Sequence, residues 1–336
     1  MTEIPSRFRA FVVDQEGERV ERGVREIGIG DLPEGSVTIR VEWSGVNYKD
    51  GLASTANGKV ARISPLIPGV DLAGTVLASD DPEIAPGTAV LAHGYDLGVA
   101  RCGGWTEIER VPAEWVVPLP PGLTTRDAMA IGTAGFTAAL SVARLEARGL
   151  EPSSGPILVT GATGGVGRTA LGILADRGYE VWAATGKASE RDRLLALGAT
   201  GVLDRSEVMA ESAKPLERER WAGAVDCIGG SALPYILRTL RHGGAVAASG
   251  NVGGPSFTTT VFPFILRDVA LIGVDSVLVP MPERRELWER IATDLRPAAL
   301  NELAMEEVGL DGLEAAIEAI LAGRMLGRTV VRVADA

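Results

Sequence analysis

Residues 155–185 read GPILVTGATGGVGRTALGILADRGYEVWAAT, and their pattern decides the fold. An apolar run from Ile157 to Thr160 is followed by glycines, then by apolar residues at helical spacing, and then by a second apolar run, Glu180 to Ala184. The hydrophobic period therefore changes from that of a strand to that of a helix and back. This order predicts a helix beginning near Val166 between two parallel strands of a doubly wound α/β sheet.

The glycines between the first strand and the helix have the pattern G-x-x-G-x-x-G, with Gly161, Gly164 and Gly167 at the three positions. Such glycines let the chain turn, let the backbone approach a pyrophosphate, and let the helix pack closely on the strand. The helix N-terminus then faces the anion. We therefore predict a dinucleotide-binding loop that consists of Gly161, Thr163, Gly164, Gly165, Val166 and Gly167.

The end of the second strand indicates which dinucleotide is bound. An NAD site normally has Asp or Glu about 20 residues after the glycines, where the carboxylate binds the ribose 2′-hydroxyl. This chain has Thr185, Gly186 and Lys187 there. A hydroxyl, a backbone N–H and a cation would hold a 2′-phosphate that a carboxylate would repel, so we predict NADPH as the cofactor.

The strand and helix pattern also predicts two domains. Before residue 125, short β-branched stretches such as SVTIRVEW and DLAGTVLA alternate with Gly and Pro, which is typical of a small antiparallel barrel or sandwich. Helical spacing begins at Thr125, the predicted N-cap, and strands then alternate with helices to about residue 265. A last strand, RTVVRV, could return to the first sheet. We predict one domain at 1–125 and 266–336, with a doubly wound, Rossmann-type dinucleotide-binding domain at 126–265 inserted into it.

Composition narrows the class of protein. The 336 residues include 33 Lys and Arg but 44 Asp and Glu, a formal net charge of -11. Nucleic-acid affinity depends on cationic side chains that neutralise phosphates, so a nucleic-acid partner is not expected. No apolar run reaches the ~20 residues that a membrane span needs, and the start, MTEIPSRFRAF, has no signal-peptide core. We expect a cytoplasmic metabolic protein with no membrane partner.

The sequence contains few Cys and His residues that could bind a metal ion. The chain has two cysteines and two histidines, which excludes a four-cysteine zinc site and a disulfide framework. A catalytic zinc would need three clustered ligands, and His93 with Cys102 is the only close pair in the sequence. We therefore predict that the protein holds no metal.

Five stretches together resemble one known family. They are GVNYKDG (45–51), which we expect to form a loop, IPGVDLAGTV (67–76), IGTAGFTAAL (131–140), VTGATGGVG (159–167) and FPFILRDVALIGVDSV (262–277). As a set they resemble the medium-chain dehydrogenase/reductases, in particular the zinc-free quinone oxidoreductase branch and its NADPH-dependent acryloyl-CoA reductases. The resemblance covers nearly the whole chain. It implies a GroES-like β-barrel-type catalytic domain with an inserted Rossmann domain.

The departures from that family also carry information. Zinc-dependent relatives have a cysteine where Asn47 stands and Gly-His-Glu where GVDLAG stands, so the resemblance implies that both metal positions are vacant. Relatives commonly have Ser-Gly-Arg at the positions of Thr185, Gly186 and Lys187. The sequence here keeps a hydroxyl and a cation but loses the bidentate fork of arginine.

The activity implied by the resemblance is hydride transfer to the β-carbon of a short α,β-unsaturated acyl-CoA, best matched by acryloyl-CoA, followed by protonation of the α-carbon. The alternatives are a quinone or enone reductase and a non-catalytic NADPH-binding protein. The resemblance implies a homodimer. It also implies catalytic roles for Asn47, Tyr48 and Asp50, nicotinamide contacts from Tyr48, Asn251, Ile265 and Ser276, and an adenosine contact from Arg205. Three roles for Tyr48 stay open: a hydrogen-bond or proton donor to substrate, a contact to the nicotinamide ribose, and packing alone.

Overall fold

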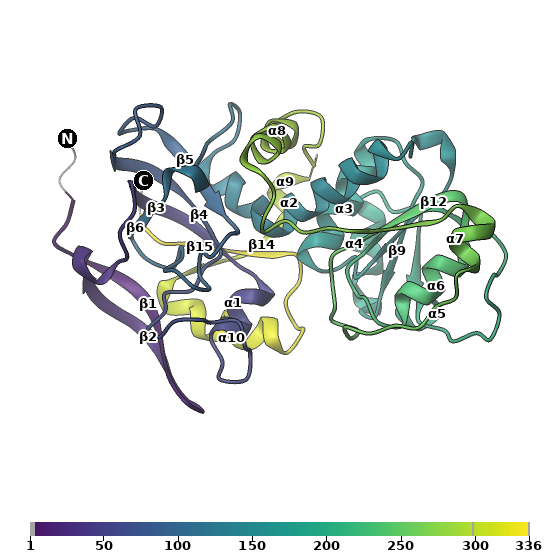
Figure 1. Ribbon diagram of the computed structural model, residues 1–336, viewed down its shortest axis with the longest axis horizontal. Coiled ribbons are helices and arrows are strands. Elements are labelled where there is room, and N and C mark those ends of the chain that lie inside the picture. Colours follow the sequence, from purple (N-terminus) through teal and green to yellow (C-terminus); the bar gives the residue numbers. More distant parts are fainter. Residues whose placement is uncertain (1–3, 298, 335–336) are drawn as a thin grey trace. The chain divides into compact units, whose positions relative to one another are not determined.

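The computed structural model describes residues 4–297 and 299–334. The chain forms two compact units (Figure 1). The first comprises Met1–Thr133, Val277–Ala292 and Leu300–Ala336, and the second comprises Ala134–Ser276 and Thr293–Ala299. The first unit therefore takes both ends of the chain. The domain boundaries predicted from the sequence, after residues 125 and 265, stay a prediction.

The first unit is built on a seven-stranded sheet with the order β14-β15-β3-β4-β5-β7, in which β6 also pairs with β3. The strand that ends the chain does return to this sheet, because β15 runs antiparallel to β3 with Thr329 opposite Val46. An N-terminal hairpin, β1 with β2, packs beside the sheet through bridges to Leu66 and Thr106. The strands are β1 (Arg7–Glu16), β2 (Arg19–Gly28), β3 (Val37–Val46), β4 (Asp71–Ser79), β5 (Ala89–His93), β6 (Ile108–Val111), β7 (Val117–Pro118), β14 (Ala304–Gly309) and β15 (Arg328–Arg332).

The first unit also contains four α-helices among its described residues. They are α1 (Tyr48–Ala53), α8 (Met281–Ala292), α9 (Leu300–Leu303) and α10 (Leu313–Leu321). Buried aliphatic side chains of the strands form the core together with one face of α10, where Leu313, Ala316 and Ile317 pack against it. The central strands β3 and β4 are buried along most of their length, so both faces of the sheet are covered there.

Helix α2 (Thr125–Ala147) leads from the first unit into the second. Its N-cap is Thr124 and not Thr125 as predicted, because the Asp127 N–H donates to the Thr124 hydroxyl at 3.0 Å and the Thr124 N–H donates to the Asp127 carboxylate at 3.1 Å. The Thr125 hydroxyl instead donates to Glu42. Helix α2 is long and apolar enough to cross a membrane, but 83% of its most apolar stretch is buried, as in a core helix.

The second unit contains the predicted doubly wound sheet. Six parallel strands have the order β10-β9-β8-β11-β12-β13. The chain first adds strands on one side of β8 and then on its other side, as in a dinucleotide-binding fold. The strands are β8 (Ile157–Thr160), β9 (Val181–Thr185), β10 (Gly201–Asp204), β11 (Trp221–Asp226), β12 (Leu240–Ala248) and β13 (Ala270–Gly273). The helices are α3 (Gly165–Asp176), α4 (Arg191–Ala196), α5 (Arg205–Val208), α6 (Ala232–Thr239) and α7 (Phe262–Arg267).

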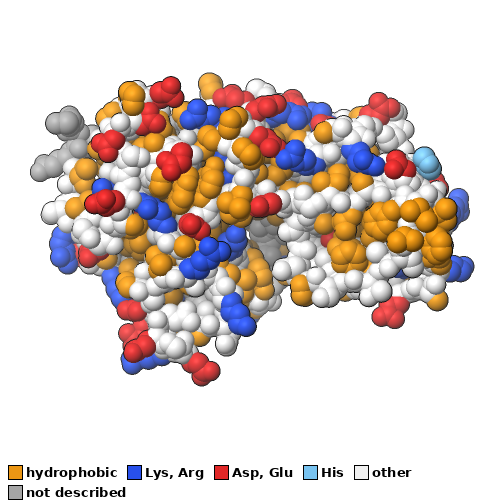
Figure 2. All heavy atoms as spheres, viewed as in Figure 1, with side chains coloured by type: hydrophobic (Ala, Val, Ile, Leu, Met, Phe, Trp, Pro, Cys, Tyr) orange, Lys and Arg blue, Asp and Glu red, His pale blue; other side chains and the backbone are white. Residues whose placement is uncertain are grey.

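The last strand of this sheet, β13, lies at its edge, and among the described residues no strand pairs with its outer side. Apolar side chains gather on the nearby surface over α7 (Figure 2). Val261, Phe262, Ile265 and Leu266 are all more than 40% exposed, and Leu271 on β13 is 37% exposed. An unprotected apolar edge strand is a template for pairing with another chain.

We predict that β13 pairs with its copy in a homodimer. Light scattering should give the mass of a dimer, and Leu271→Lys should shift it toward the monomer by placing a charge at that edge. Leu195→Lys is the matched control, because Leu195 on α4 is also 37% exposed and lies away from β13 in the chain and the sheet. A wild-type monomer at all concentrations would contradict the prediction.

Candidate active site and cofactor loop

The Asn-Tyr-Lys-Asp stretch, predicted as a loop, forms the start of a helix. Strand β3 ends at Val46, and α1 begins at Tyr48, with Asn47 at the N-cap position. The Asp50 carboxylate accepts a hydrogen bond of 2.8 Å from the Asn47 backbone N–H. An acid three residues after the N-cap satisfies one of the free N–H groups of a helix start, which explains why the helix begins here.

Asp50 also holds this helix start against another segment. Its second oxygen accepts from the backbone N–H groups of Gly69, at 3.1 Å, and Val70, at 2.9 Å, and its side chain is fully buried. Burial and the nearby Asp71 carboxylate raise the pKa of Asp50 to about 7, against the lowering effect of the N–H donors. With all of its contacts inside the protein, Asp50 can orient the Asn47–Tyr48 segment but is not placed to touch a ligand.

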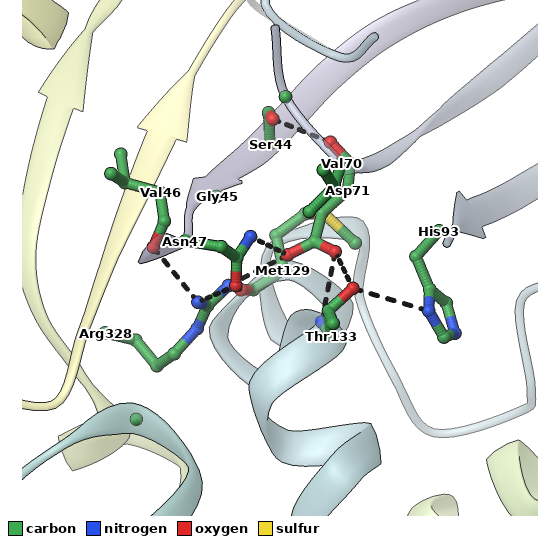
Figure 3. Close-up of polar contacts among 12 residues, drawn as sticks. Ser44, Gly45, Val46, Asn47, Val70, Asp71, His93, Met129, Thr133 and Arg328 are labelled. Carbon is green, nitrogen blue, oxygen red and sulfur yellow. Dashed lines mark hydrogen bonds and ion pairs between the residues drawn. The ribbon is translucent and has the colours of Figure 1, made fainter. Parts of the chain in front are cut away.

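Asn47 is half-buried and belongs to a polar network that joins three segments through the buried Asp71 and Arg328 (Figure 3). Its amide Nδ2 donates to the Asp71 Oδ2 at 2.8 Å, and its Oδ1 accepts from the Arg328 Nη1 at 2.7 Å. Arg328 and Asp71 form an ion pair at 3.0 Å, and neither side chain is more than 3% exposed. The two contacts on Asn47 determine which way its amide faces, because the donor must face the carboxylate and the acceptor must face the guanidinium.

Two glycines make room for this guanidinium. A Cβ on Gly45 or on Gly132 would overlap the Arg328 Nη2. Gly132 also has a φ of +52°, a conformation that favours glycine, and it interrupts the helical geometry of α2. The Arg328 Nη1 donates a further bond, of 3.2 Å, to the carbonyl of Val46.

Sequence reasoning did not identify Arg328 or Asp71 as site residues. A signal was present in each case, because both are charged residues at the start of strands that are rich in apolar residues, β15 and β4. A charged group in such a position is rarely buried without a partner. The sequence does not say which partner it has.

Tyr48, the other predicted catalytic residue, faces outward. It is 43% exposed, and within residues 4–297 and 299–334 its hydroxyl has no hydrogen-bond partner. A phenol with an apolar ring and a free hydroxyl can contact a flat ligand and donate one hydrogen bond to it. The structure therefore leaves Tyr48 available to a ligand, whereas Asn47 and Asp50 are used to shape the helix start.

In the second unit, the glycine loop has the geometry that its spacing predicts. Gly161 has a φ of +60°, and a Cβ on Gly167 would lie only 2.5 Å from the Gly161 carbonyl oxygen, so these two glycines allow the turn and the close approach of α3. A Cβ on Gly164 would be in ordinary contact at 3.4 Å. Internal packing therefore does not require a glycine at 164, which is the position expected to face a pyrophosphate.

Four predicted cofactor residues lie together at the carboxyl ends of β9 and β10. The Thr185 hydroxyl lies 3.2 Å from the Thr163 hydroxyl and accepts from the Lys187 backbone N–H at 3.1 Å. Arg205 follows Asp204, the β10 residue opposite Thr185, and its Nε would lie 3.3 Å from a Cβ on Gly186. Burial lowers the pKa of Lys187, against the opposing effect of Glu190. The structure thus collects a hydroxyl and two cations at this edge.

The three residues implied to contact nicotinamide have different surroundings. Asn251 follows β12 and is exposed, with its Cα 3.2 Å from the Cβ position of Gly229, so it belongs to the same carboxyl edge of the sheet. Ser276 is buried, and its hydroxyl accepts from the Thr137 hydroxyl at 2.8 Å. Ile265 is 67% exposed on α7, within the apolar surface described above.

Both units match models of known protein families. Residues 33–121 match the alcohol dehydrogenase GroES-like domain, and residues 165–293 match the zinc-binding dehydrogenase model. Acrylyl-CoA reductase AcuI of Ruegeria pomeroyi is 47% identical over 97% of this chain and 99% of its own. The chain belongs to the medium-chain dehydrogenase/reductase family. Within that family it is quinone oxidoreductase-like and an oxidoreductase.

Two further relatives have solved structures. YhfP of Bacillus subtilis, whose name assigns it provisionally to the quinone oxidoreductases, is 47% identical over 97% of this chain and 98% of its own. Its structure with NAD bound covers 98% of this chain and 100% of its own, with a TM-score of 0.96. The YhdH oxidoreductase of Salmonella enterica, in complex with NADP, is 45% identical, covers 97% of this chain and 100% of its own, and has a TM-score of 0.93.

The family model is described as zinc-binding, but the side chains around Asn47 do not suit zinc. Among the described residues, no group of three or more His, Cys, Asp and Glu side chains is placed to hold a metal ion. The Asp71 carboxylate is paired with Arg328, and the Asn47 amide bonds both partners, so a guanidinium occupies the centre of this cluster. These residues do not fit a tetrahedral zinc site.

The absence of a metal stays a prediction, tested by elemental analysis of protein purified without a His-tag. We expect far less than one zinc ion per protein chain. We also expect full activity after treatment with a chelator. Stoichiometric zinc whose removal abolished activity would overturn the prediction.

Proposed function

We propose that this protein uses NADPH to reduce the C=C bond of a short α,β-unsaturated acyl-CoA, best matched by acryloyl-CoA giving propanoyl-CoA, without a metal. We further propose that it acts in the cytoplasm as a homodimer. The observation that carries the proposal is the 47% identity, over nearly the whole length of both chains, with a protein named acrylyl-CoA reductase. The site residues and the substrate class that follow are part of this proposal.

The glycine loop and the ends of β9 and β10 fit NADPH. The Gly161–Gly167 loop and the start of α3 would hold the pyrophosphate, because backbone N–H groups and the helix dipole favour an anion there. Thr185, Lys187 and Arg205 would hold the 2′-phosphate. When bound, NADPH would supply the hydride that adds to the β-carbon of the substrate.

The residues around Asn47 meet the other physical demands of this reaction, which are to orient the substrate and to stabilise growing enolate charge. Asp50 and Asn47 hold the start of α1 in one conformation through the contacts described above. Tyr48 is thereby presented with a free hydroxyl. In our proposal Tyr48 contacts the cofactor ribose or donates a hydrogen bond toward the substrate, and Asn47 and Asp50 act by positioning it.

A second candidate is an NADPH-dependent quinone or enone reductase. The observation that favours it is the equal identity, 47%, with YhfP, whose name places it among quinone oxidoreductases. A third candidate, a non-catalytic NADPH-binding protein, would have no need of the exposed Tyr48 on a helix start held by buried polar contacts.

The proposal is tested by following NADPH oxidation with acryloyl-CoA, crotonyl-CoA and a simple quinone side by side. We expect the highest kcat/KM with acryloyl-CoA. A quinone turned over far faster than either thioester would favour the second candidate and sink the first. Binding of NADPH without turnover of any substrate would favour the third.

Lys187→Ala tests the predicted cofactor preference. Loss of one charge-assisted contact to the 2′-phosphate should weaken NADPH binding by roughly ten- to a hundredfold and leave NADH binding nearly unchanged. Lys214→Ala is the control, because Lys214 is exposed in the same unit, outside the predicted site. Equal losses for both cofactors would mean that Lys187 has a structural role only.

Tyr48→Phe separates the three roles of the phenol. A large fall in kcat with unchanged NADPH affinity indicates donation to the substrate, whereas weaker NADPH binding indicates a ribose contact. We expect the second result, because an apolar ring with one free hydroxyl suits a contact with the cofactor ribose. If neither quantity changes, Tyr48 only packs and does not belong to the site.

A further inference from the structure

A second cluster lies against the Asn47 network and consists of the buried side chains of His93, Arg284 and Trp288 and the half-buried Thr133. His93 ends β5 and is 1% exposed, while Arg284 and Trp288 come from α8 and are fully buried. Thr133 follows the glycine at which α2 departs from helical geometry. None of these four side chains belongs to the predicted site, yet Thr133 bonds directly to Asp71.

The indole of Trp288 determines how the His93 ring is protonated. Its Nε1–H lies 3.0 Å from the His93 Nε2, and an indole N–H can only donate, so this ring nitrogen must accept. Burial and the positive charge of Arg284 lower the pKa of His93 well below its usual value, which keeps the ring neutral. The single ring proton is then on Nδ1.

Arg284 does not alter this assignment. Its Nη1 lies 3.0 Å from both ring nitrogens and donates to the His93 carbonyl, also at 3.0 Å. A position equally far from the two nitrogens favours neither tautomer. Its positive charge does oppose a second proton on the ring, which would place two buried cations in contact.

With the proton on Nδ1, the rest of the chain of hydrogen bonds has only one direction. The His93 Nδ1 lies 3.5 Å from the Thr133 hydroxyl oxygen, which therefore accepts a hydrogen bond from the ring N–H, while the hydroxyl hydrogen is donated to Asp71 (Figure 3). The Thr133 hydroxyl and backbone N–H both bond the Asp71 Oδ1, the latter at 3.1 Å. The other oxygen, Oδ2, is then left for Asn47 and Arg328.

We propose that His93 and Thr133 are positioning residues, which hold Asp71 so that it orients Asn47 and the start of α1. This proposal rests on the proposed function in one respect, namely that the residues at the start of α1 contact the cofactor or the substrate. The direction of the relay, from Trp288 through His93 and Thr133 to Asp71, is a property of the protein itself and can be tested without any substrate.

The first test is nitrogen NMR of the imidazole rings in protein labelled at histidine. The chain has only two histidines, and His242 is exposed, so His242→Gln assigns both sets of signals without touching the relay. We expect His93 to show the tautomer with the proton on Nδ1 and to stay neutral through the neutral pH range, because burial and Arg284 lower its pKa. A His93 ring that titrates in that range, or that bears its proton on Nε2, would overturn the proposal.

The second test compares Thr133→Val, which has the same shape without the hydroxyl, with Thr133→Ser, which keeps the hydroxyl. We expect the valine variant to lower kcat by about ten- to a hundredfold with little change in NADPH affinity, and the serine variant to recover most of that loss. A His242→Gln control should behave as the wild type.

Equal losses in the valine and serine variants, or no loss in either, would overturn the positioning role even if the NMR result held. A failure of the proposed function has a different signature. Wild-type protein would then be inactive toward enoyl thioesters while the His93 tautomer stayed as described, and the two variants would be compared with the substrate that is turned over.

Discussion

A buried ion pair between Arg328 and Asp71 is the interaction on which the first unit depends. The pair connects strand β15 to strand β4. Asn47 forms hydrogen bonds with both partners. Removing one partner of such a pair leaves an uncompensated buried charge, which costs about 3–5 kcal/mol. The pair also explains why glycines stand at 45 and 132, because each leaves the space that the guanidinium fills.

In this chain the Arg328 guanidinium, and not a metal ion, organises the polar side chains near Asn47. The family model that matches residues 165–293 is described as zinc-binding, yet the donors near Asn47 are a carboxylate already paired and an amide already bonded on both sides. A guanidinium is always charged and forms several directed hydrogen bonds, so it can organise neighbouring acceptors as a fixed positive centre. A carboxylate and an amide are thereby held in one arrangement next to Tyr48.

The sequence predicts the second unit far better than the first, for a physical reason. Its strands and helices follow one another along the chain, and the period of their apolar residues is a local signal, so the order of β8, α3 and β9 can be predicted with errors of a residue at the ends. The misplaced cap of α2 is an error of that kind, because two threonines stand side by side and only the contacts of Asp127 distinguish them.

The network around Asn47 has no such signal. Arg328 and Asp71 are 257 positions apart, and Thr133 meets Asp71 across 62 positions, so neither partner is visible in the pattern around the other. The stretch Asn47–Asp50, expected to be a loop, instead forms the start of helix α1, because the Asp50 carboxylate caps the helix there. The sequence can suggest candidate site residues such as Asn47, Tyr48 and Asp50. Which residues hold the others in place depends on contacts between distant segments, as with Arg328 and Asp71.

The central claim is that the Arg328–Asp71 pair holds this unit together, and it is tested most directly by the stability of Arg328→Met. Arg332→Met is the matched control, because Arg332 lies on the same strand, β15, and pairs with Glu307 while 58% exposed. Urea unfolding should show a loss of about 3–5 kcal/mol for Arg328→Met and less than about 1 kcal/mol for Arg332→Met. An Arg328→Met protein as stable as the control would contradict the account.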